Sequence, residues 1–325
     1  MPVALRPVTD ADVPGLIALH NAVLPDYPQS VEELQHSIDA WDSTRFFMRR
    51  LVAEDETGQI VGMVRVSHLP DQFHPDRYAM DLTVHPDHRR RGIGSTLYDR
   101  LLTVMRERGA IALRGEVKED MPEAVAFVEH RGFVEVERSW ESRLDVTTFD
   151  MTRFAGADDR LTAAGVRITT LAAEQARSSR ALRDIYELQV ACDHDVPSVD
   201  PITAVPFEQF IAHEVEGPDA LPDGYYLAAT GEGEEMRYVG MSSLFASAGK
   251  PDVLYQGLTG VLPEYRGRGV AMALKLQTVR YAWEHGKREI RTWNDTTNRP
   301  MLRINEAMGF VKQPIWIGVQ KTLRD

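Results

Sequence analysis

Two short segments of the chain place arginines and glycines directly before a helical pattern of apolar residues. Residues 266–271 read RGRGVA, and residues 89–95 read RRRGIGS. Small residues leave backbone N–H groups bare, and a helix start carries roughly half a positive charge. Phosphate groups bind at such starts, and guanidinium groups nearby add to the attraction. Both segments are therefore predicted to bind a diphosphate.

Other phosphate-binding signatures are missing from the sequence. No GxxxxGK[ST] lysine loop occurs, and neither segment continues as the GxGxxG dinucleotide fingerprint. A basic loop followed by an ordinary helix cap is the plain alternative for either segment taken alone. The choice between the two interpretations depends on the surrounding sequence.

The two segments belong to a longer internal repeat. The frame V-x-P-x-x-R-x-x-G-[IV]-[GA]-x-x-L covers residues 84–97 and again residues 261–274, which lie 177 positions later. The same shift carries Gly132-Phe133 onto Gly309-Phe310. A constant spacing over about fifty residues indicates a duplication. We therefore predict an N-terminal domain at 1–150, a polar linker at 151–164 with room for a helix, and a C-terminal domain at 165–325.

Each half predicts the same order of elements around its loop. A first strand and helices precede a hairpin, at 51–54 with 60–66 in one half and at 225–229 with 238–243 in the other. A strand then enters the loop, and apolar residues at helical spacing follow it. A further strand, a short helix that ends in Gly-Phe and a final strand complete the half. The class is mixed α/β.

With these motifs in place, the chain resembles the GNAT superfamily of N-acetyltransferases in its tandem-domain form. The repeated frame matches the superfamily's acetyl-CoA pyrophosphate loop, and residues 298–310 resemble its second signature segment. The resemblance implies two tandem GNAT-like domains, each a mixed, mostly antiparallel splayed sheet flanked by helices. In the second domain the sheet would open between the strand that ends at Val261 and the strand at 289–293, with the pantetheine arm along the edge of 258–261.

The resemblance also assigns the cofactor residues. Acetyl-CoA is the expected cosubstrate, and no metal is expected. The candidate cofactor-binding residues of the second half are Gly260, Val261, Arg266, Gly267, Arg268, Gly269, Val270, Ala271, Asn294 and Asn298. Those of the first half are Val84, Arg89, Arg91, Gly92, Gly94 and Ser95.

The implied mechanism is direct attack of a neutral amine on the thioester, which needs a base, an oxyanion donor and an acid for the thiolate. A backbone N–H near Val261 is the candidate oxyanion donor. Tyr255 lies where related enzymes often carry a carboxylate base, and an aromatic that fills the cleft is its alternative. Asn305 occupies the usual place of a tyrosine acid. Because an amide is no acid, the thiolate would take its proton from water or from the product ammonium.

The two halves are predicted to differ in activity. The second half carries Asn298 where the first carries Met121, and it has Asn294 near the end of the preceding strand. We therefore expect the second half to be catalytic. The first half is expected to be degenerate, with weak coenzyme A binding or a structural role.

A polar stretch between the opening helices of the second half is the candidate acceptor site. Asp193, His194 and Asp195 would face a cationic substrate there, or else form an ordinary polar loop. A metal site is disfavoured because the separated partner pair of ligands is missing. A nucleophilic role of Cys192, the only cysteine, is disfavoured because the mechanism needs no acyl-enzyme.

Composition limits the partners. The net charge is −12, with 43% hydrophobic and 26% charged residues. This charge opposes binding to nucleic acid or anionic membranes, even though residues 85–91 read HPDHRRR. One cysteine and no signal segment indicate a cytoplasmic protein. We expect it to be a monomer or a homodimer.

Three functions remain open at this point. An acetyl-CoA-dependent N-acetyltransferase acting on a small-molecule amine is the first. A non-catalytic acyl-CoA-binding sensor is the second, and a protein lysine or N-terminal acetyltransferase is the third. Acceptor specificity lies in segments without a readable motif.

Overall fold

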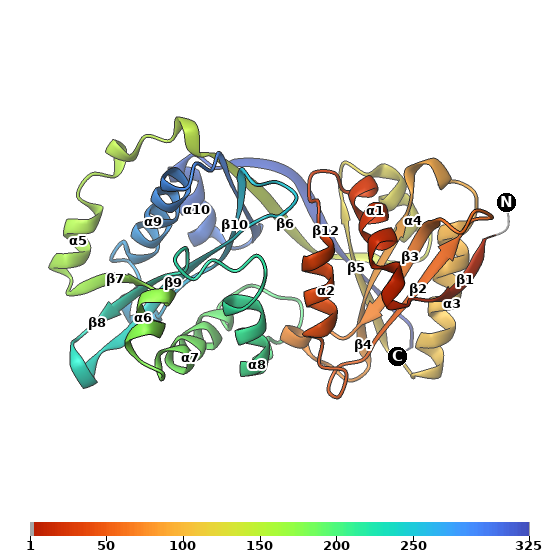
Figure 1. Ribbon diagram of the computed structural model, residues 1–325, viewed down its shortest axis with the longest axis horizontal. Helices are drawn as coiled ribbons and strands as arrows, with labels where there is room; N and C mark the ends of the chain where they lie inside the picture. The colour runs from red at the N-terminus through yellow and green to blue at the C-terminus, as the bar shows by residue number, and fades with distance from the viewer. Residues whose placement is uncertain (1–2, 325) are drawn as a thin grey trace. The chain divides into compact units, whose positions relative to one another are not determined.

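The computed structural model describes residues 3–324 and contains two compact units (Figure 1). Unit 1 consists of Met1–Arg138, Val199–Thr203 and Ile315–Asp325, and unit 2 of Ser139–Ser198 and Ala204–Pro314. Each unit contributes its own set of strands, flanked by its own helices.

The sheet of unit 1 follows the predicted order. Its strands are β1 (Ala4–Pro7), β2 (Met48–Glu54), β3 (Ile60–Ser67), β4 (Arg77–Val84), β5 (Ala112–Lys118) and, from Ile315 onward, β12 (Val311–Thr322). Neighbours run antiparallel except for β4 and β5, which are parallel. The predicted hairpin of β2 and β3 is confirmed.

Helices cover both faces of this sheet. The helices of unit 1 are α1 (Val13–Val23), α2 (Val31–Asp39), α3 (Ile93–Glu107) and α4 (Pro122–Glu129), with short 3-10 turns at Asp10–Asp12, Pro70–Gln72 and Pro86–His88. Leu97 and Leu101 of α3 join a core with Leu113 of β5, whereas Leu16 of α1 packs with Val52 of β2 in a separate cluster. Because Leu51 and Ala53 belong to the α3 cluster, α1 lies on the face opposite to α3.

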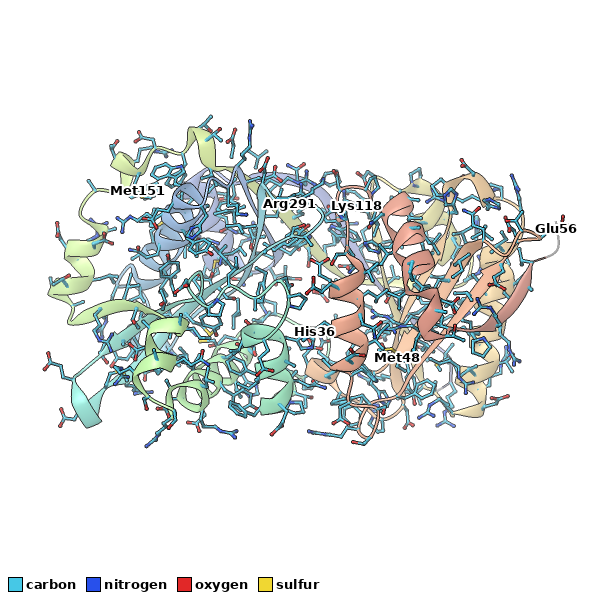
Figure 2. All side chains as sticks on the ribbon, viewed as in Figure 1. His36, Met48, Glu56, Lys118, Met151 and Arg291 are labelled. Carbon is cyan, nitrogen blue, oxygen red and sulfur yellow. The ribbon has the colours of Figure 1, made fainter. Side chains whose placement is uncertain are left out.

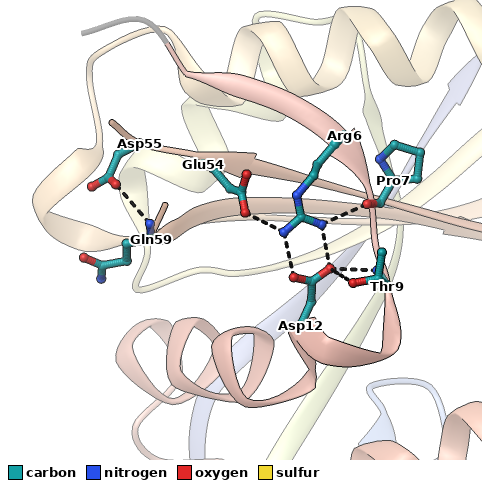
Figure 3. Close-up of polar contacts among 7 residues, drawn as sticks. All are labelled: Arg6, Pro7, Thr9, Asp12, Glu54, Asp55 and Gln59. Carbon is teal, nitrogen blue, oxygen red and sulfur yellow. Dashed lines mark hydrogen bonds and ion pairs between the residues drawn. The ribbon is translucent and has the colours of Figure 1, made fainter. Parts of the chain in front are cut away.

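A polar cluster ties the start of α1 to the edge of the sheet (Figure 3). Arg6 of β1 donates to Asp12 Oδ1 at 2.7 Å and also binds Glu54 of β2. Asp12 in turn accepts from the backbone N–H of Thr9 at 2.7 Å. One carboxylate thus caps the turn and holds the first strand.

Unit 2 repeats the arrangement with its own strands and helices. Its strands are β7 (Val166–Thr170), β8 (Tyr226–Thr230), β9 (Arg237–Phe245), β10 (Val253–Val261), β11 (Glu289–Asp295) and, from Ser139 onward, β6 (Val134–Asp145). Its helices are α5 (Ala157–Ala163), α6 (Leu171–Arg177), α7 (Ala181–Asp193), α8 (Phe207–Phe210), α9 (Val270–Glu284) and α10 (Arg299–Met308). A π-helical turn at Ile211–Val215 continues α8, and 3-10 turns lie at Val146–Thr148, Met151–Phe154, Gly233–Glu235 and Pro263–Tyr265.

The last strand of each repeat completes the sheet of the other. β6 follows α4 of unit 1, yet its residues 139–145 pair with β11. β12 follows α10 of unit 2, yet its residues 316–322 pair with β5 (Figure 1). The compact units therefore differ from the predicted domains 1–150 and 165–325 by these exchanged strands, by residues 146–164, which lie in unit 2, and by Val199–Thr203, which lies in unit 1.

The segment predicted as a linker, residues 151–164, is folded. It holds a 3-10 turn and α5, whose Ala157 and Leu161 are buried. Asp158 of α5 forms an ion pair with Arg280 of α9 at 2.8 Å. The segment is thus an integral part of unit 2.

Within the described residues 3–324, no helix combines the length and the apolar character needed to cross a membrane.

Candidate active site

Both sheets open at their one parallel pair of strands. In unit 1, β4 and β5 pair only from Arg77–Ala79 to Ala112–Arg114, and both strands then continue apart. In unit 2, β10 and β11 pair only from Val253–Tyr255 to Glu289–Arg291. Each sheet therefore has a V-shaped gap, as expected from the sequence, whose open end lies toward the glycine loop.

The loop beyond each gap presents unpaired amides. Gly92 and Gly269 both adopt the left-handed conformation at φ 83° and lead directly into α3 and α9. Over the part of the chain that the structure describes, the backbone N–H groups of 90–95 and 267–272 donate to no protein acceptor. A Cβ built on either glycine meets nothing within 4 Å, so the space in front of each loop is open. Both loops fit a diphosphate, and the assignment of their individual residues to a cofactor stays a prediction.

The arginines of the motif have protein partners. Arg266 Nε donates to the carbonyl of Val261 at 2.8 Å, and Arg89 Nε donates to the carbonyl of Val84 at 3.2 Å. Arg266 also forms an ion pair with Asp195. The first arginine of each frame thus fixes the loop to the end of its strand, a role that the sequence alone did not indicate.

The other polar side chains of the two loops are Arg268, Arg91 and Ser95. Arg268 Nη2 donates to the carbonyl of Glu264 at 2.9 Å, and Arg91 is exposed beside its loop. Ser95 Oγ accepts from Arg131 Nη2 at 2.7 Å. The bare amides, rather than these side chains, are the groups available to a ligand.

Unit 1 contains a cleft of about 780 Å³ along its gap. Its lining comes from the open ends of β4 and β5, the glycine loop, α4, the end of α1 and one side chain of β12. The loop residues that line the cleft are Arg89, Arg90, Gly92, Ile93, Gly94 and Ser95. One cavity therefore joins the unpaired amides to the vertex of the V.

Charged side chains of β4 and β5 lie along this cleft, from beyond the vertex to the open end of β5. Asp81 of β4 accepts from Arg65 Nε at 2.7 Å. Lys118, labelled in Figure 2, lies 3.6 Å from Asp120 and over the rings of Tyr27 and Trp316. Asp81 and Lys118 thus each have a partner of opposite charge.

Glu116, between the vertex and Lys118, is the third of these charged residues and has a different environment. Its side chain is exposed to the open cleft rather than buried in the core, and the partial loss of hydration there, followed by the negative charges of Glu137 and Asp81, raises the pKa of its carboxyl to about 7. A lone glutamate on a strand forms no motif, so sequence analysis missed it. The raised pKa suits a group that accepts and releases a proton near neutrality.

The gap of unit 2 has a bulge in β10. The register with β9 shifts between Gln256 and Thr259, and the side chain of Ser243 lies under the bulge, where its Oγ has no hydrogen-bond partner. A Cβ on Gly257 would lie 2.4 Å from that oxygen. A bulge leaves backbone groups unpaired, and bulges recur beside active sites.

Tyr255, the candidate base, lies at the vertex of this gap. Its ring is 5.7 Å from that of Trp293, at an angle of 42°. Trp293 is the position that corresponds to Glu116 in the repeat, so the vertex of unit 2 is aromatic where that of unit 1 is acidic. The catalytic role of Tyr255 stays a prediction.

The three asparagines of the second half have two kinds of contact. Asn298 Oδ1 accepts from the N–H of Met301 at 3.3 Å, which is the contact of a helix cap. Asn305 is 2% exposed and donates from Nδ2 to Asn294 Oδ1 at 2.7 Å. Asn305 Oδ1 is buried and has no partner among residues 3–324, which leaves one acceptor for a ligand N–H. Their roles toward the cofactor and in catalysis remain predictions.

The candidate acceptor residues lie at the end of α7. Asp195 binds Arg266, and His194 forms the C-cap of the helix. Loss of hydration is the main cause that raises the pKa of Glu214 to about 7, and the negative charge of Asp193 is the second. Glu214 lies on the π-helical turn, and its Oε2 is buried without a partner. Asp193 and Glu214 thus form an acidic pair that the sequence revealed only in part.

Cys192 has no reactive environment. It is 3% exposed, and burial raises the pKa of its thiol to about 12. A thiol with this pKa stays protonated near neutral pH and makes a poor nucleophile. No cluster of three or more His, Cys, Asp or Glu side chains that could hold a metal is found among the described residues.

A model of the acetyltransferase (GNAT) family matches residues 16–133 and 182–310, which is more than half of the chain. The chain belongs to the GNAT family. The two matches lie in the two repeats, and the family that they identify is one of acetyltransferases.

Curated GNAT relatives cover most of the chain. The mycothiol acetyltransferase of Nocardiopsis dassonvillei is 26% identical over 266 residues, which are 78% of this chain and 76% of the relative. The mycothiol acetyltransferase of Thermomonospora curvata is 26% identical over 260 residues, 80% of this chain and 78% of the relative.

Solved structures show the same tandem GNAT fold. A tandem GNAT protein from the clavulanic acid biosynthesis pathway superposes with a TM-score of 0.72 at 21% identity, over 100% of this chain and 99% of that one. A GCN5-related N-acetyltransferase from Sphaerobacter thermophilus gives a TM-score of 0.69 at 19% identity, over 99% and 96%. The predicted fold class, two GNAT-like domains with splayed sheets, is confirmed.

Proposed function

We propose that this protein transfers the acetyl group of acetyl-CoA to a primary amine of a small molecule. The observation that supports it best is the cleft of unit 1, which joins six unpaired loop amides to the vertex of a splayed sheet. The net charge of −12 favours a cationic acceptor at long range.

The dimensions of the gap fit a phosphate-anchored arm. From Val84 to Ala79 is five residues, or about 16 Å at the usual rise of a strand. A pantetheine arm whose diphosphate binds the amides of 90–95 would extend along this edge toward the vertex. Acetyl-CoA supplies an activated thioester, which would then lie near Asp81 and Glu116.

In unit 2 the corresponding groups are the amides of 267–272 and the bulge of β10. Unpaired backbone N–H groups at the bulge suit an oxyanion, and loss of one such donor costs about 10²–10³ in rate. Asn305 Oδ1, without a partner among the described side chains, offers an acceptor. Unit 2 thus also supports a cofactor site, with Tyr255 beside it.

Release of free thiol from acetyl-CoA across a panel of small amines tests the proposal. A sensor would release none above hydrolysis, and a protein acetyltransferase would prefer peptides. Gly92→Ala and Gly269→Ala form a matched pair of variants, because each adds one methyl group to an open cradle with no protein atom within 4 Å. Each is expected to remove acetyl-CoA binding at its own loop, as measured by calorimetry on the full chain.

A further inference from the structure

Glu116 projects into the cleft of unit 1 at the level where the two parallel strands separate. The last residue of β5 that pairs with β4 is Arg114. Glu116 therefore lies two residues further along, on the part of β5 that is no longer paired with β4. Leu113 and Val117 pack into the core with α3, which places Glu116 on the opposite face of the strand. Met80 and Leu82 pack with α3 in the same way, so Asp81 shares that face.

The charges around Glu116 come from several elements. Asp81 is supplied by β4 and bound by Arg65 of β3, and Glu137 is supplied by β6. On β5 itself, Lys118 lies beside Asp120, and Arg114 forms an ion pair with Asp200 at 2.8 Å. The two cations of β5 are therefore matched with other acids, Arg50 of β2 is close to Asp81 and Arg65, and Glu116 has no ion pair among the described residues.

A glycine brings the acidic neighbours together. Gly318 of β12 is the cross-strand partner of Glu116, and Glu137 Cβ lies 3.0 Å from where a Cβ of Gly318 would be. No side chain on β12 therefore separates Glu116 from Glu137. The end of α1 contributes only Val23 and Leu24 to the cleft lining, so no cation comes from that helix.

We propose that Glu116 is the proton acceptor for an amine bound in the cleft of unit 1, so that the first repeat carries a transfer site of its own. This inference rests on the proposed function and assigns it a residue. It also reverses the expected order of the repeats, since the equivalent position of unit 2 is Trp293, which cannot accept a proton.

The chemistry at Glu116 balances without another reagent. The acceptor enters as an ammonium ion and gives one proton to the carboxylate. The neutral amine attacks the thioester carbonyl, the C–N bond forms and the C–S bond breaks. The second proton of the nitrogen passes to the departing thiolate, and Glu116 returns its proton to water. The products are the amide and free thiol.

The raised pKa supports this role. A glutamate near 7 is ionised in about half of the molecules at neutral pH, and is a stronger base than an ordinary carboxylate. The rate should therefore rise with pH through an acid limb near pH 7.

Glu116→Gln on the full chain tests the proposal. The variant keeps the size of the side chain and removes the base, so kcat/KM for an amine found in the panel should fall by about 10²–10⁴ with unchanged acetyl-CoA affinity. The acid limb near pH 7 should disappear. Glu135→Gln is the matched control, since Glu135 lies outside the cleft lining and pairs with Arg138.

Asp81→Asn gives a second, independent readout. Removal of one negative neighbour should lower the pKa of Glu116 and move the acid limb to lower pH, with Glu116 still in place. A merely structural role of Glu116 would leave that limb where it is.

The outcomes separate the two ideas. Wild-type protein that binds acetyl-CoA and acetylates no amine overturns both the proposed function and this inference. Wild-type turnover that Glu116→Gln leaves unchanged, or a wild-type profile without a limb near pH 7, overturns the inference alone. Loss of turnover with intact binding of acetyl-CoA supports it.

Discussion

The indole of Trp316 meets the ring of Tyr27 edge-on, with 5.7 Å between the ring centroids. Trp316 lies in the last strand of the chain and also lines the cleft of unit 1. The C-terminal residues therefore form part of the candidate site that the N-terminal repeat builds.

Removal of residues 315–325 should disrupt unit 1 and spare unit 2. β5 would lose the partner of residues 112–118 and the cleft would lose one wall, whereas β11 would keep its pairing with β6. Amide hydrogen exchange should show fast exchange in β5 and continued protection in β11.

Trp316→Phe is the control for this truncation, because it keeps the strand and an aromatic ring. Protection of β5 should persist in this variant. Equal loss of protection in β5 and β11 after truncation would contradict the assignment of β12 to unit 1.

Lys275→Met should stabilise the protein. Lys275 is 1% exposed, and burial lowers the pKa of its ammonium group to about 7. Below pH 7 the folded state must carry this buried charge, so the free energy of unfolding is reduced there. From pH 7 to about 10.5 the unfolded chain binds more protons than the folded one, and stability rises with pH.

The gain from Lys275→Met should thus be largest at pH 6, of order 2–4 kcal/mol, and should fade toward pH 10. Urea unfolding at several pH values measures it. Lys312→Met is the control, since Lys312 is exposed and bound to Glu306. A gain that does not depend on pH would show that Lys275 is not a buried cation in the folded state.

Gly260→Ala should destabilise unit 2. The new Cβ would lie 2.5 Å from Cys192 Cβ and 2.7 Å from its sulfur, so α7 would have to move away from β10. Overpacking of this kind costs about 1–3 kcal/mol. Thermal unfolding of the single variant and of Gly260→Ala with Cys192→Gly measures the coupling. The second change should recover part of the loss, and simple additivity would refute the contact.

Asp12→Asn should weaken the protein at neutral pH and have less effect in acid. The Arg6 guanidinium holds the pKa of the Asp12 carboxyl well below its usual range. A depressed carboxyl pKa contributes stability above the usual value near 4, and this contribution is lost as the pH falls further. The gap between variant and wild type in urea midpoint should therefore narrow below about pH 4. Asp10→Asn, at an exposed neighbour, should show no such trend.

Local patterns predicted most of the fold because each has a direct physical meaning. The shift that relates Gly92 to Gly269 predicted the duplication, and small residues before apolar helices predicted the bare amides. The splayed strands followed from the resemblance. The exchange of β6 and β12 could not be predicted, since a duplicated chain offers two similar edges, β5 and β11, and the strand sequence does not say which edge it joins.

The candidate site was predicted only where it carries a motif. The glycine loops are such motifs, and Asn305 was found by its spacing from Asn298. Glu116 and Glu214 were missed because their importance comes from surroundings that the tertiary fold supplies. The link from Arg266 to Asp195 joins residues that lie far apart along the chain.

The pairing of β12 with β5 also has a consequence for synthesis on the ribosome. Protein domains generally fold as units while the chain emerges from its N-terminus. Here the sheet of the first repeat must wait for residues 316–322, which are translated only after the second repeat. The edge of β5 is therefore without its native partner until the second repeat has been made, and the repeat that is translated first is completed after the one that follows it.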